Sequence, residues 1–340
     1  MNTAKIVTAA AATDDSDRGK KMTSERIGFR ETADFLRQHD NYVILSHANP
    51  DGDTLGCAFA LCRTLQKLGK KAKNICADEI SRRYDFMKEA VEVQEFDPEV
   101  YISVDVADRK LLGDFDKLYG DKIELAIDHH VSHVGFAKML LLEPHAAAAA
   151  QTVYKLIFEL GGSALLDEKT AACLYTGIST DSGCFKYSCA TPETHRIAAE
   201  LLEYGFDHAH IDYVFFDLKT KARIALEEQI YRDIEYYCGG KCALVSLTRE
   251  QLETVDSEDS NGLSAIPRQI EGVEVGVVIK QRRNGSWKAS LRSNSEVDVQ
   301  KICAVFGGGG HVKAAGCSFY NTSLESAKKQ LVAEIGKALE

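Results

Sequence analysis

The sequence has 340 residues, of which 45% are hydrophobic and 27% are charged, and this balance predicts a globular protein with room for two domains. No apolar run reaches the length of a membrane-spanning helix, so we expect no membrane partner. The formal net charge of −10 argues against broad binding of long duplex nucleic acid, although a metal cluster could still attract one small anion.

The first 25 residues combine a short, interrupted apolar stretch with an acidic patch. This pattern predicts a disordered leader (residues 1–25) rather than a signal peptide. The ten cysteines further along the chain form no CxxC pair, so we expect reduced thiols and a cytoplasmic protein.

Residues 26–206 alternate short apolar runs with helical patterns. This alternation predicts an α/β fold with a doubly wound parallel sheet. The expected strands are residues 42–46, 73–75, 101–104, 124–127 and 139–142. The expected helices are residues 54–68, 146–160, 168–178 and 194–204.

The remaining chain is predicted to hold a connector and a second domain. Residues 207–237 are charged, aromatic and helical, as in helices that connect domains. Residues 238–340 are predicted to form a smaller α+β domain with a turn at Asn284-Gly285. Its expected elements are strands 242–246, 273–280 and 287–291, a glycine run, a further strand and a closing helix, 324–339.

Carboxylate and imidazole side chains follow the ends of several predicted parallel strands, where open α/β sheets bind their ligands. The candidate metal ligands are His47, Asp51, Asp53, Asp105, His129 and Asp181. Mixed carboxylate and imidazole donors without thiolate favour Mn2+, with Mg2+ as the alternative. Six donors exceed the needs of one open catalytic ion, so we expect two divalent cations.

Each of these residues also has an ordinary structural interpretation. Asp53 precedes a predicted helix and could be only an N-cap, and an isolated histidine is more often a satisfied polar residue than a ligand. That interpretation would have to hold independently at four strand or helix ends. The metal interpretation is therefore the favoured one.

The motifs resemble those of the DHH phosphoesterase superfamily, which is named for the sequence found here as Asp128-His129-His130. Three further motifs of that family match residues 47–53, 104–105 and 179–185. Residues 306–316, FGGGGHVKAAG, resemble the signature of the associated DHHA1 domain. The resemblance covers about residues 26–340.

The resemblance implies a role for each site residue. One ion would bind His47, Asp51 and Asp105, and the other would bind Asp53, Asp105, His129 and Asp181. Asp128 would orient an imidazole, and His130 would face the substrate phosphate as hydrogen-bond donor or general acid. The implied substrate contacts are Arg292, Gly308, Gly309, Gly310, His311 and Lys313. Arg109 is evenly balanced between a phosphate contact and a surface ion pair.

One departure from the family pattern stands at Ala146–Ala150 and Gln151, where relatives usually carry Ser or Thr and a Glu. Any polar contribution of that segment is therefore expected to change.

Within the superfamily, the compact two-domain chain most resembles the bifunctional oligoribonucleases and PAP phosphatases. That group implies a Mn-dependent hydrolase of very short RNA and of the 3′-phosphate of 3′-phosphoadenosine 5′-phosphate. Its partners would be short RNA or small nucleotides, and a homodimer is compatible with the sequence. The alternatives are a cyclic or linear dinucleotide phosphodiesterase, a family II inorganic pyrophosphatase, and a nucleotide-binding regulator with little catalysis.

Overall fold

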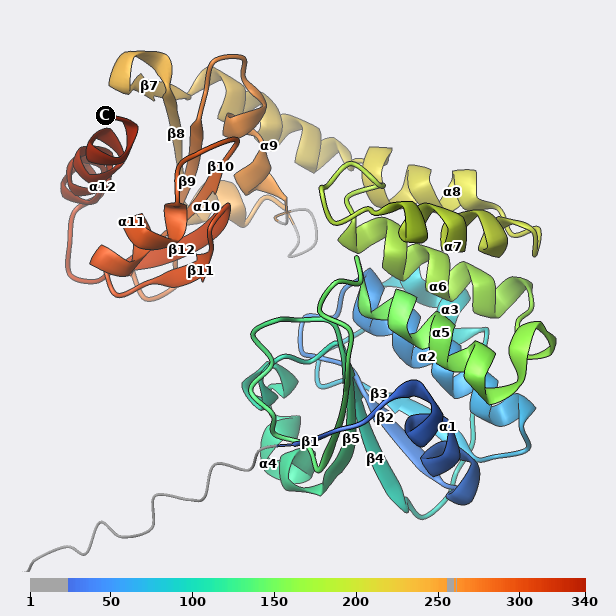
Figure 1. Ribbon diagram of the computed structural model, residues 1–340. Coiled ribbons are helices and arrows are strands. Elements are labelled where there is room, and N and C mark those ends of the chain that lie inside the picture. The colour runs from blue at the N-terminus through green and yellow to red at the C-terminus, as the bar shows by residue number, and fades with distance from the viewer. Residues whose placement is uncertain (1–23, 256–259, 261) are drawn as a thin grey trace, which may run out of the picture. The chain divides into compact units, whose positions relative to one another are not determined.

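The computed structural model describes residues 24–255, 260 and 262–340, and the chain divides into two compact units, Met1–Asp217 and Leu218–Glu340 (Figure 1). Residues 1–23 of the predicted leader lie outside the described residues. Glu25, which the same prediction placed in the leader, already belongs to the first strand. The division between the units falls within the predicted connector.

The N-terminal unit contains a six-stranded parallel sheet in the order β1-β6-β5-β4-β2-β3. Its strands are β1 (Glu25–Arg26), β2 (Tyr42–Leu45), β3 (Ala72–Ile75), β4 (Val100–Val104), β5 (Ile123–Asp128) and β6 (Met139–Leu142). The chain turns to opposite sides of the sheet from β2 and β4, so the topological switch point lies between these two neighbours. The predicted α/β fold class is confirmed.

Helices cover both faces of this sheet, with α1, α2 and α5 on one face and α4 on the other (Figure 1). The helices are α1 (Phe29–Gln38), α2 (Gly52–Lys67), α3 (Asp85–Lys88), α4 (Phe115–Tyr119), α5 (Ala149–Gly161), α6 (Glu168–Asp181), α7 (Pro192–Leu202) and α8 (His208–Asp212). Apolar strand residues such as Ile44 and Val43 enter separate cores on the two faces. Burial on both faces explains why the central strands are continuous apolar runs.

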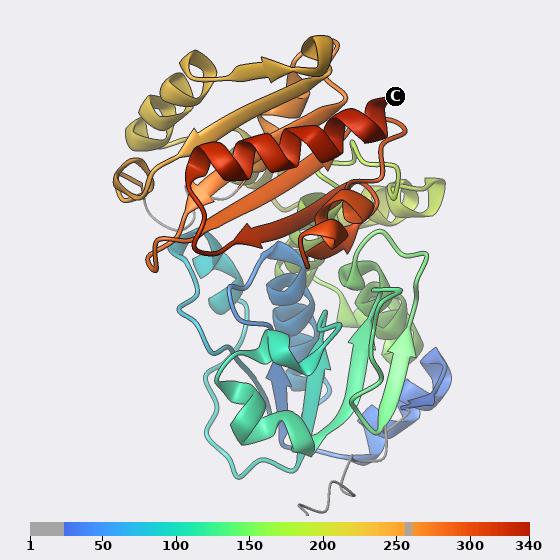
Figure 2. The ribbon, with the colours of Figure 1, turned by 90° about the vertical axis from the view of Figure 1, so that its left-hand side faces the viewer.

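The C-terminal unit contains a second six-stranded sheet in the order β11-β12-β10-β9-β8-β7, antiparallel except for the β8–β9 pair. Its strands are β7 (Glu235–Tyr237), β8 (Cys242–Leu247), β9 (Val275–Gln281), β10 (Trp287–Ser293), β11 (Gly309–His311) and β12 (Ala314–Phe319). Its helices are α9 (Lys221–Arg232), α10 (Arg249–Leu252), α11 (Val299–Val305) and α12 (Leu324–Leu339). Figure 2 shows α12 lying along one face of this sheet.

Three segments differ from the predicted elements. Glu235–Tyr237, expected to be helical, forms strand β7 against β8, and part of the glycine run forms strand β11. The helix expected from residue 146 begins at Ala149. In β7 and β11, pairing with another strand overrides the local preference of the sequence, whereas α5 begins where its first backbone N–H groups donate to Asp53.

The ten cysteines are free thiols, as predicted. Within the described part of the chain, no helix is both long and apolar enough to cross a membrane.

Candidate active site

The candidate site lies at the carboxyl end of the parallel sheet, at the switch point between β2 and β4. The segment that follows β2 carries His47, Asp51 and Asp53, and Asp105 follows β4. Asp128 is the last residue of β5, the next strand in the sheet. The fold therefore brings residues that are about 80 positions apart in the chain to one edge, as open α/β sheets do for their ligands.

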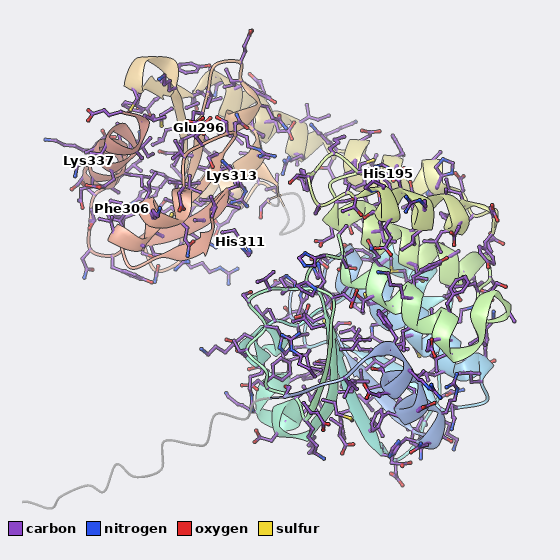
Figure 3. All side chains as sticks on the ribbon, viewed as in Figure 1. His195, Glu296, Phe306, His311, Lys313 and Lys337 are labelled. Atoms are coloured by element: carbon purple, nitrogen blue, oxygen red, sulfur yellow. The ribbon has the colours of Figure 1, made fainter. Side chains whose placement is uncertain are left out.

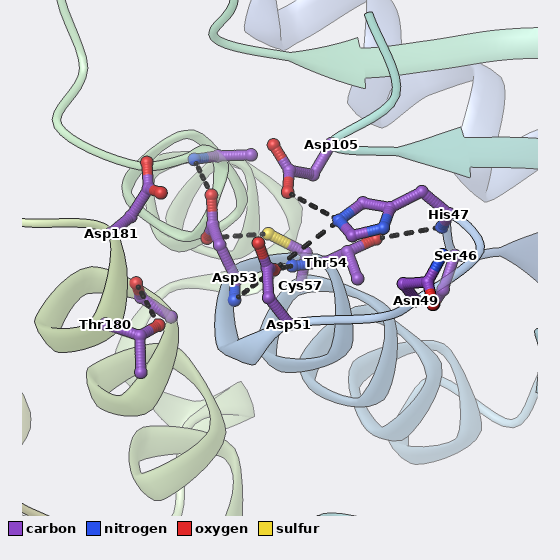
Figure 4. A network of polar contacts seen from close by, with 12 residues as sticks. Ser46, His47, Asn49, Asp51, Asp53, Thr54, Cys57, Asp105, Thr180 and Asp181 are labelled. Atoms are coloured by element: carbon purple, nitrogen blue, oxygen red, sulfur yellow. Dashed lines mark hydrogen bonds and ion pairs between the residues drawn. The ribbon is translucent and has the colours of Figure 1, made fainter. Parts of the chain in front are cut away.

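The His47 imidazole is held with one nitrogen toward two carboxylates. Its Nδ1 lies 2.9 Å from the Ala48 carbonyl oxygen, which can only accept, so Nδ1 carries the hydrogen. Nε2 then faces Asp51 Oδ1 at 3.5 Å and Asp105 Oδ2 at 3.8 Å, as Figure 4 shows. A backbone carbonyl that fixes the ring in this way is the usual support of a metal-binding histidine.

His129 repeats the arrangement from the other side of the site. Its Nδ1 is 3.1 Å from the Ala146 carbonyl oxygen. Its Nε2 lies 3.3 Å from Asp181 Oδ2, 3.6 Å from Asp105 Oδ1 and 3.9 Å from Asp53 Oδ2. Among the described residues, His129 Nε2 and Asp105 Oδ1 are buried without a hydrogen-bond partner. Two such atoms facing one another fit a divalent cation between them.

Asp105 occupies the centre of the cluster in a strained backbone conformation. Its φ is 57°, in the left-handed region that few residues other than glycine adopt. Burial, together with the charges of Asp53, Asp51 and Asp181, raises the pKa of Asp105 well above its ordinary value. The strained backbone and the repulsion between carboxylates both destabilise the fold at Asp105. Because such destabilising features persist mainly at functional sites, Asp105 is a candidate for a functional role.

Asp53 is anchored by the beginning of α5. Its Oδ2 accepts a hydrogen bond from the Ala149 N–H at 2.6 Å, and its Oδ1 accepts one from the Ala150 N–H at 2.9 Å. The N-cap residue Ala148 has no side-chain acceptor, so Asp53 takes the place of the cap. Gly177 of α6 permits this approach, because a Cβ there would lie 2.8 Å from Asp53 Oδ1.

Asp128 holds the ring of His130. Its Oδ1 accepts from the backbone N–H groups of His129 and His130, at 2.7 and 3.2 Å, and from His130 Nδ1 at 2.9 Å. The hydrogen bond to Asp128 raises the pKa of His130. Burial is the largest single effect and opposes ionisation of Asp128, but the hydrogen bonds and charge of His130 together with the charge of His133 outweigh it and lower the pKa of Asp128. His130 Nε2 is left for a ligand.

The structure brings all six predicted metal ligands together with Asp128 and His130. They form three overlapping groups, within each of which the donor atoms all lie within 4.8 Å of one another: Asp105, Asp128, His129 and His130; His47, Asp51 and Asp105; and Asp53, His129 and Asp181. Arg109 does not join them. Its guanidinium forms ion pairs with Asp116 and Asp121, so the structure describes the ion-pair alternative for this residue.

Two of the predicted substrate residues of the C-terminal unit, Arg292 and His311, share one face of its sheet. His311 of β11 and Arg292 of β10 both pair with Ala314 of β12, which lies between them. Paired residues on adjacent strands point to the same face. Figure 3 places His311 and Lys313 at the same side of this unit.

The glycines before His311 have different roles. A Cβ at Gly308 would lie 2.2 Å from the Gly316 carbonyl oxygen, and one at Gly310 would lie 2.5 Å from the Ala314 carbonyl oxygen. These two glycines are thus required by the close approach to β12. Only Gly309 of the three faces open space, where a ligand could approach its backbone.

The alanines at Ala146–Ala150, where relatives usually carry Ser or Thr, do not disrupt the hydrogen bonds that hold the candidate metal ligands. The alanines contribute backbone N–H groups to Asp53 and a carbonyl oxygen to His129, which any residue could supply. The buried Gln151 accepts from Thr194 Oγ1 and donates to Glu193 Oε2, each at 3.0 Å. Its amide therefore supports α7 rather than the cluster.

Sequence reasoning missed His133, four residues beyond His129. Its side chain is fully buried, and its Nδ1 accepts from the Gly135 N–H, so Nε2 carries the hydrogen and points toward Asp128 Oδ2, 3.9 Å away. Nothing in the local sequence distinguishes this histidine from a surface residue.

Comparisons with known proteins match both units. The model of the DHH family, N-terminal domain, matches residues 41–178, and that of the DHHA1 domain matches residues 244–340. The bifunctional oligoribonuclease and PAP phosphatase NrnA of Thermus thermophilus is 31% identical over 87% of this chain and 89% of its own. The Bacillus subtilis protein of that name is 25% identical over 83% of this chain and 90% of its own. The crystal structure of an exopolyphosphatase-related protein from Bacteroides fragilis has a TM-score of 0.81 at 25% identity, covering 92% of this chain and 97% of that one.

Proposed function

The chain belongs to the DHH phosphoesterase family, and on that premise we propose that it hydrolyses very short RNA and the 3′-phosphate of 3′-phosphoadenosine 5′-phosphate. The relatives from Thermus thermophilus and Bacillus subtilis are named for these two activities. The observation that carries the proposal is the facing pair of buried, unpartnered atoms, His129 Nε2 and Asp105 Oδ1, beside the oriented ring of His130.

We propose that the cluster holds two divalent cations, with Mn2+ as the resident metal. His47, Asp51 and Asp105 would hold one, and Asp53, Asp105, His129 and Asp181 the other. The donors are carboxylate oxygens and imidazole nitrogens, a set that suits Mn2+ better than the thiolate-preferring metals. When bound, such cations supply charge neutralisation at a phosphoryl group and lower the pKa of water.

His130 would act on the leaving oxygen of the phosphoester. Asp128 fixes its Nδ1 as a donor, which leaves Nε2 for the substrate, and raises the pKa of His130 so that the ring is more readily protonated near neutrality. A protonated imidazole can donate to an oxygen that gains negative charge as the P–O bond breaks. Asp128 acts through His130 by keeping the ring in one orientation.

Arg292, His311 and Lys313 would bind the substrate phosphate or nucleotide, with the backbone of Gly309 beside them. Arg292 and His311 lie on one sheet face of the C-terminal unit, and a guanidinium can bind phosphate through two parallel hydrogen bonds. The net charge of −10 favours short substrates over long duplexes, and ten free thiols suit a cytoplasmic enzyme.

The test is Mn2+-dependent release of mononucleotide from a 5′-labelled RNA dinucleotide, beside phosphate release from 3′-phosphoadenosine 5′-phosphate. We expect turnover of both, loss of both with EDTA, and a large fall in kcat for His130→Ala but not for the exposed His210→Ala. Turnover of neither substrate by Mn2+-loaded protein would overturn the proposal. Turnover of a cyclic dinucleotide alone would reassign the enzyme to that substrate.

A further inference from the structure

The two carboxylate oxygens of Asp128 are satisfied unequally. Oδ1 accepts from the backbone N–H groups of His129 and His130 and from His130 Nδ1. Oδ2 is buried and has no hydrogen-bond partner among the described residues. Because Asp128 is fully buried, an unpaired carboxylate oxygen there is costly and calls for a donor.

The imidazole of His133 faces this second oxygen. Its Nε2 lies 3.9 Å from Asp128 Oδ2 and, within the part of the chain that the structure describes, is itself buried without a hydrogen-bond partner. His133 Nδ1 accepts from the Gly135 N–H at 3.0 Å, so the neutral ring carries its hydrogen on Nε2. Burial lowers the pKa of His133, which favours this neutral form. A buried donor and a buried acceptor thus face one another.

The loop after β5 fixes the His133 ring in this orientation. The His133 N–H donates to the His130 carbonyl oxygen at 3.1 Å, which closes a turn, and the Val134 N–H donates to the Ala107 carbonyl oxygen at 2.9 Å. The Phe136 ring stacks on the imidazole, with 5.0 Å between the ring centroids and 20° between the planes. Contacts to the backbone and to an aromatic ring therefore direct Nε2 at Asp128.

The distance between the two atoms is that of a contact ready to close. A separation of 3.9 Å exceeds an ordinary N–H···O hydrogen bond by about 1 Å. Hydrogen bonds between catalytic groups are often long in the free enzyme and shorten in the complex with substrate. A carboxylate bound through one oxygen can still turn about its Cβ–Cγ bond, because this torsion has no sharp energy wells. A bond from His133 would remove that freedom.

We propose that His133 is a positioning residue of the phosphoester reaction, which donates from Nε2 to Asp128 Oδ2 and thereby fixes the ring of His130. The inference rests on the proposed function and deepens it, because it adds a third member to the pair of Asp128 and His130. Catalytic side chains are commonly oriented by such a third group. His133 contacts no substrate, so its effect is on kcat and passes through His130.

The experiment compares the wild type with two variants of His133. His133→Leu keeps a buried side chain but has no donor, whereas the amide of His133→Gln retains an N–H at a similar reach. We expect kcat for an RNA dinucleotide to fall about tenfold or more in His133→Leu, with KM within about threefold, and most of the lost kcat to return in His133→Gln. An unchanged kcat in His133→Leu, or an equal loss in both variants, overturns the proposal.

An activated substrate separates positioning from a general loss of structure. A p-nitrophenyl phosphodiester releases nitrophenolate, which needs no proton from His130. His133→Leu should therefore retain most of the wild-type kcat with this ester. In the His130→Ala background, His133→Leu should lower kcat for the dinucleotide by less than about twofold further. Equal losses on both substrates, or a further tenfold loss in that background, would contradict an action through His130.

The matched control is Phe136→Leu, which removes the stacking ring of the same loop but no group that faces Asp128. This variant should lower the Tm while kcat for the dinucleotide stays within about twofold, because the donor on His133 remains. A fall in kcat as large as that of His133→Leu would assign the effect to the loop as a whole and overturn the proposal.

NMR of the EDTA-treated protein with isotope-labelled histidines distinguishes failure of this inference from failure of the proposed function. The His130 Nδ1–H is bound to Asp128 and should exchange slowly with water in the wild type and in His133→Gln. In His133→Leu its exchange should be about tenfold faster or more. Faster exchange in that variant alone supports the positioning role even if no phosphoester is hydrolysed. Equal exchange in all three proteins refutes it.

Discussion

Asp105 combines three features that each destabilise the metal-free fold: a buried carboxyl group, repulsion by neighbouring carboxylates and a left-handed backbone conformation. Its carboxylate is buried beside His47, His129 and His130 and is repelled by the neighbouring carboxylates, while its backbone holds a left-handed conformation. Burying such a charge is costly unless a partner of opposite charge compensates. The protein without metal therefore holds a destabilising cluster, which bound cations would turn into a stabilising one.

Asp105→Asn should separate these two effects. Without metal, the variant should be more stable than the wild type at high pH, because the amide cannot acquire the buried negative charge that the raised pKa of Asp105 opposes. At Mn2+ about 100 times the Kd, the wild type gains about 2.7 kcal/mol, or roughly 5–10 °C in the Tm of this unit, and the variant should lose that gain. Its activity should fall more than about 100-fold, since changes to groups that only support ligands already cost about 10–100-fold.

Thermal unfolding with EDTA and with Mn2+ provides the measurement. Asp121→Asn is the control, because that carboxylate is exposed and pairs with Arg109 outside the cluster. An Asp105→Asn variant that keeps the full Mn2+-induced rise in Tm would remove Asp105 from the metal site.

The same carboxylates determine how the stability of the metal-free protein depends on pH. Burial, with the charges of Asp53 and Asp51, raises the pKa of Asp181 from 3.8 to about 8. A group whose pKa is raised in the folded state contributes stability that is complete below the unfolded pKa and is lost as pH rises through the folded one. The Tm in EDTA should therefore fall between about pH 4 and pH 8.

Asp181→Asn should flatten this fall, because the amide does not titrate. With Mn2+ present the sign reverses, since cations need the ionised carboxylate, and the rise in Tm caused by Mn2+ should grow with pH. Equal slopes for the variant and the wild type in EDTA would show that Asp181 does not govern this dependence.

At the scale of elements, the end of one helix holds a ligand of the site. The beginning of α5 donates two backbone N–H groups to Asp53, which belongs to α2. Ala149→Pro should disrupt this support while keeping the helix, because proline suits the first helical position and Ala148 already has an extended conformation (φ −156°, ψ 154°). We expect Mn2+ affinity to fall about 10–100-fold.

Isothermal titration with Mn2+ measures this change. The matched control is Lys221→Pro, the same substitution at the first position of α9 in the C-terminal unit, where the N-cap Thr220 accepts from the Arg223 N–H. Similar Mn2+ affinities in the two variants would argue that the α5 N–H groups do not support the metal site. Circular dichroism should show both variants to be folded.

The elements also show where sequence reasoning succeeds and where it ends. The central strands were predictable because burial on both faces produces apolar runs, and the ligands were predictable because parallel strands end at one edge. The start of α5 was not predictable, because the side chain that caps it is Asp53, which is 96 positions away in the sequence. Strand β11 was not predictable, since glycine has little preference for strands and the close approach of Gly310 to β12 is visible only in the folded chain. The side chain of His133 is buried beside Asp128, and no local sequence pattern indicates that position.

At the scale of the whole molecule, each unit has its own hydrophobic core. The cores of the N-terminal unit surround residues such as Leu55 and Leu140, and those of the C-terminal unit surround residues such as Leu331 and Val245. No residue of one unit belongs to a core of the other in the described parts of the chain. Units with separate cores can unfold separately.

We therefore expect two unfolding transitions in calorimetry of the full chain, of which Mn2+ raises only one, because all the proposed ligands lie in the N-terminal unit. Leu331→Ala should lower only the unfolding temperature of the C-terminal unit. Leu331 is fully buried in the core of that unit, and its truncation costs about 2–5 kcal/mol. The two perturbations should then act independently, with the Mn2+-induced shift of the first transition equal in the variant and the wild type. A single transition that responds to both would mean that the units unfold cooperatively, and a Mn2+-induced shift of the transition lowered by Leu331→Ala would place a metal-dependent contribution in the C-terminal unit.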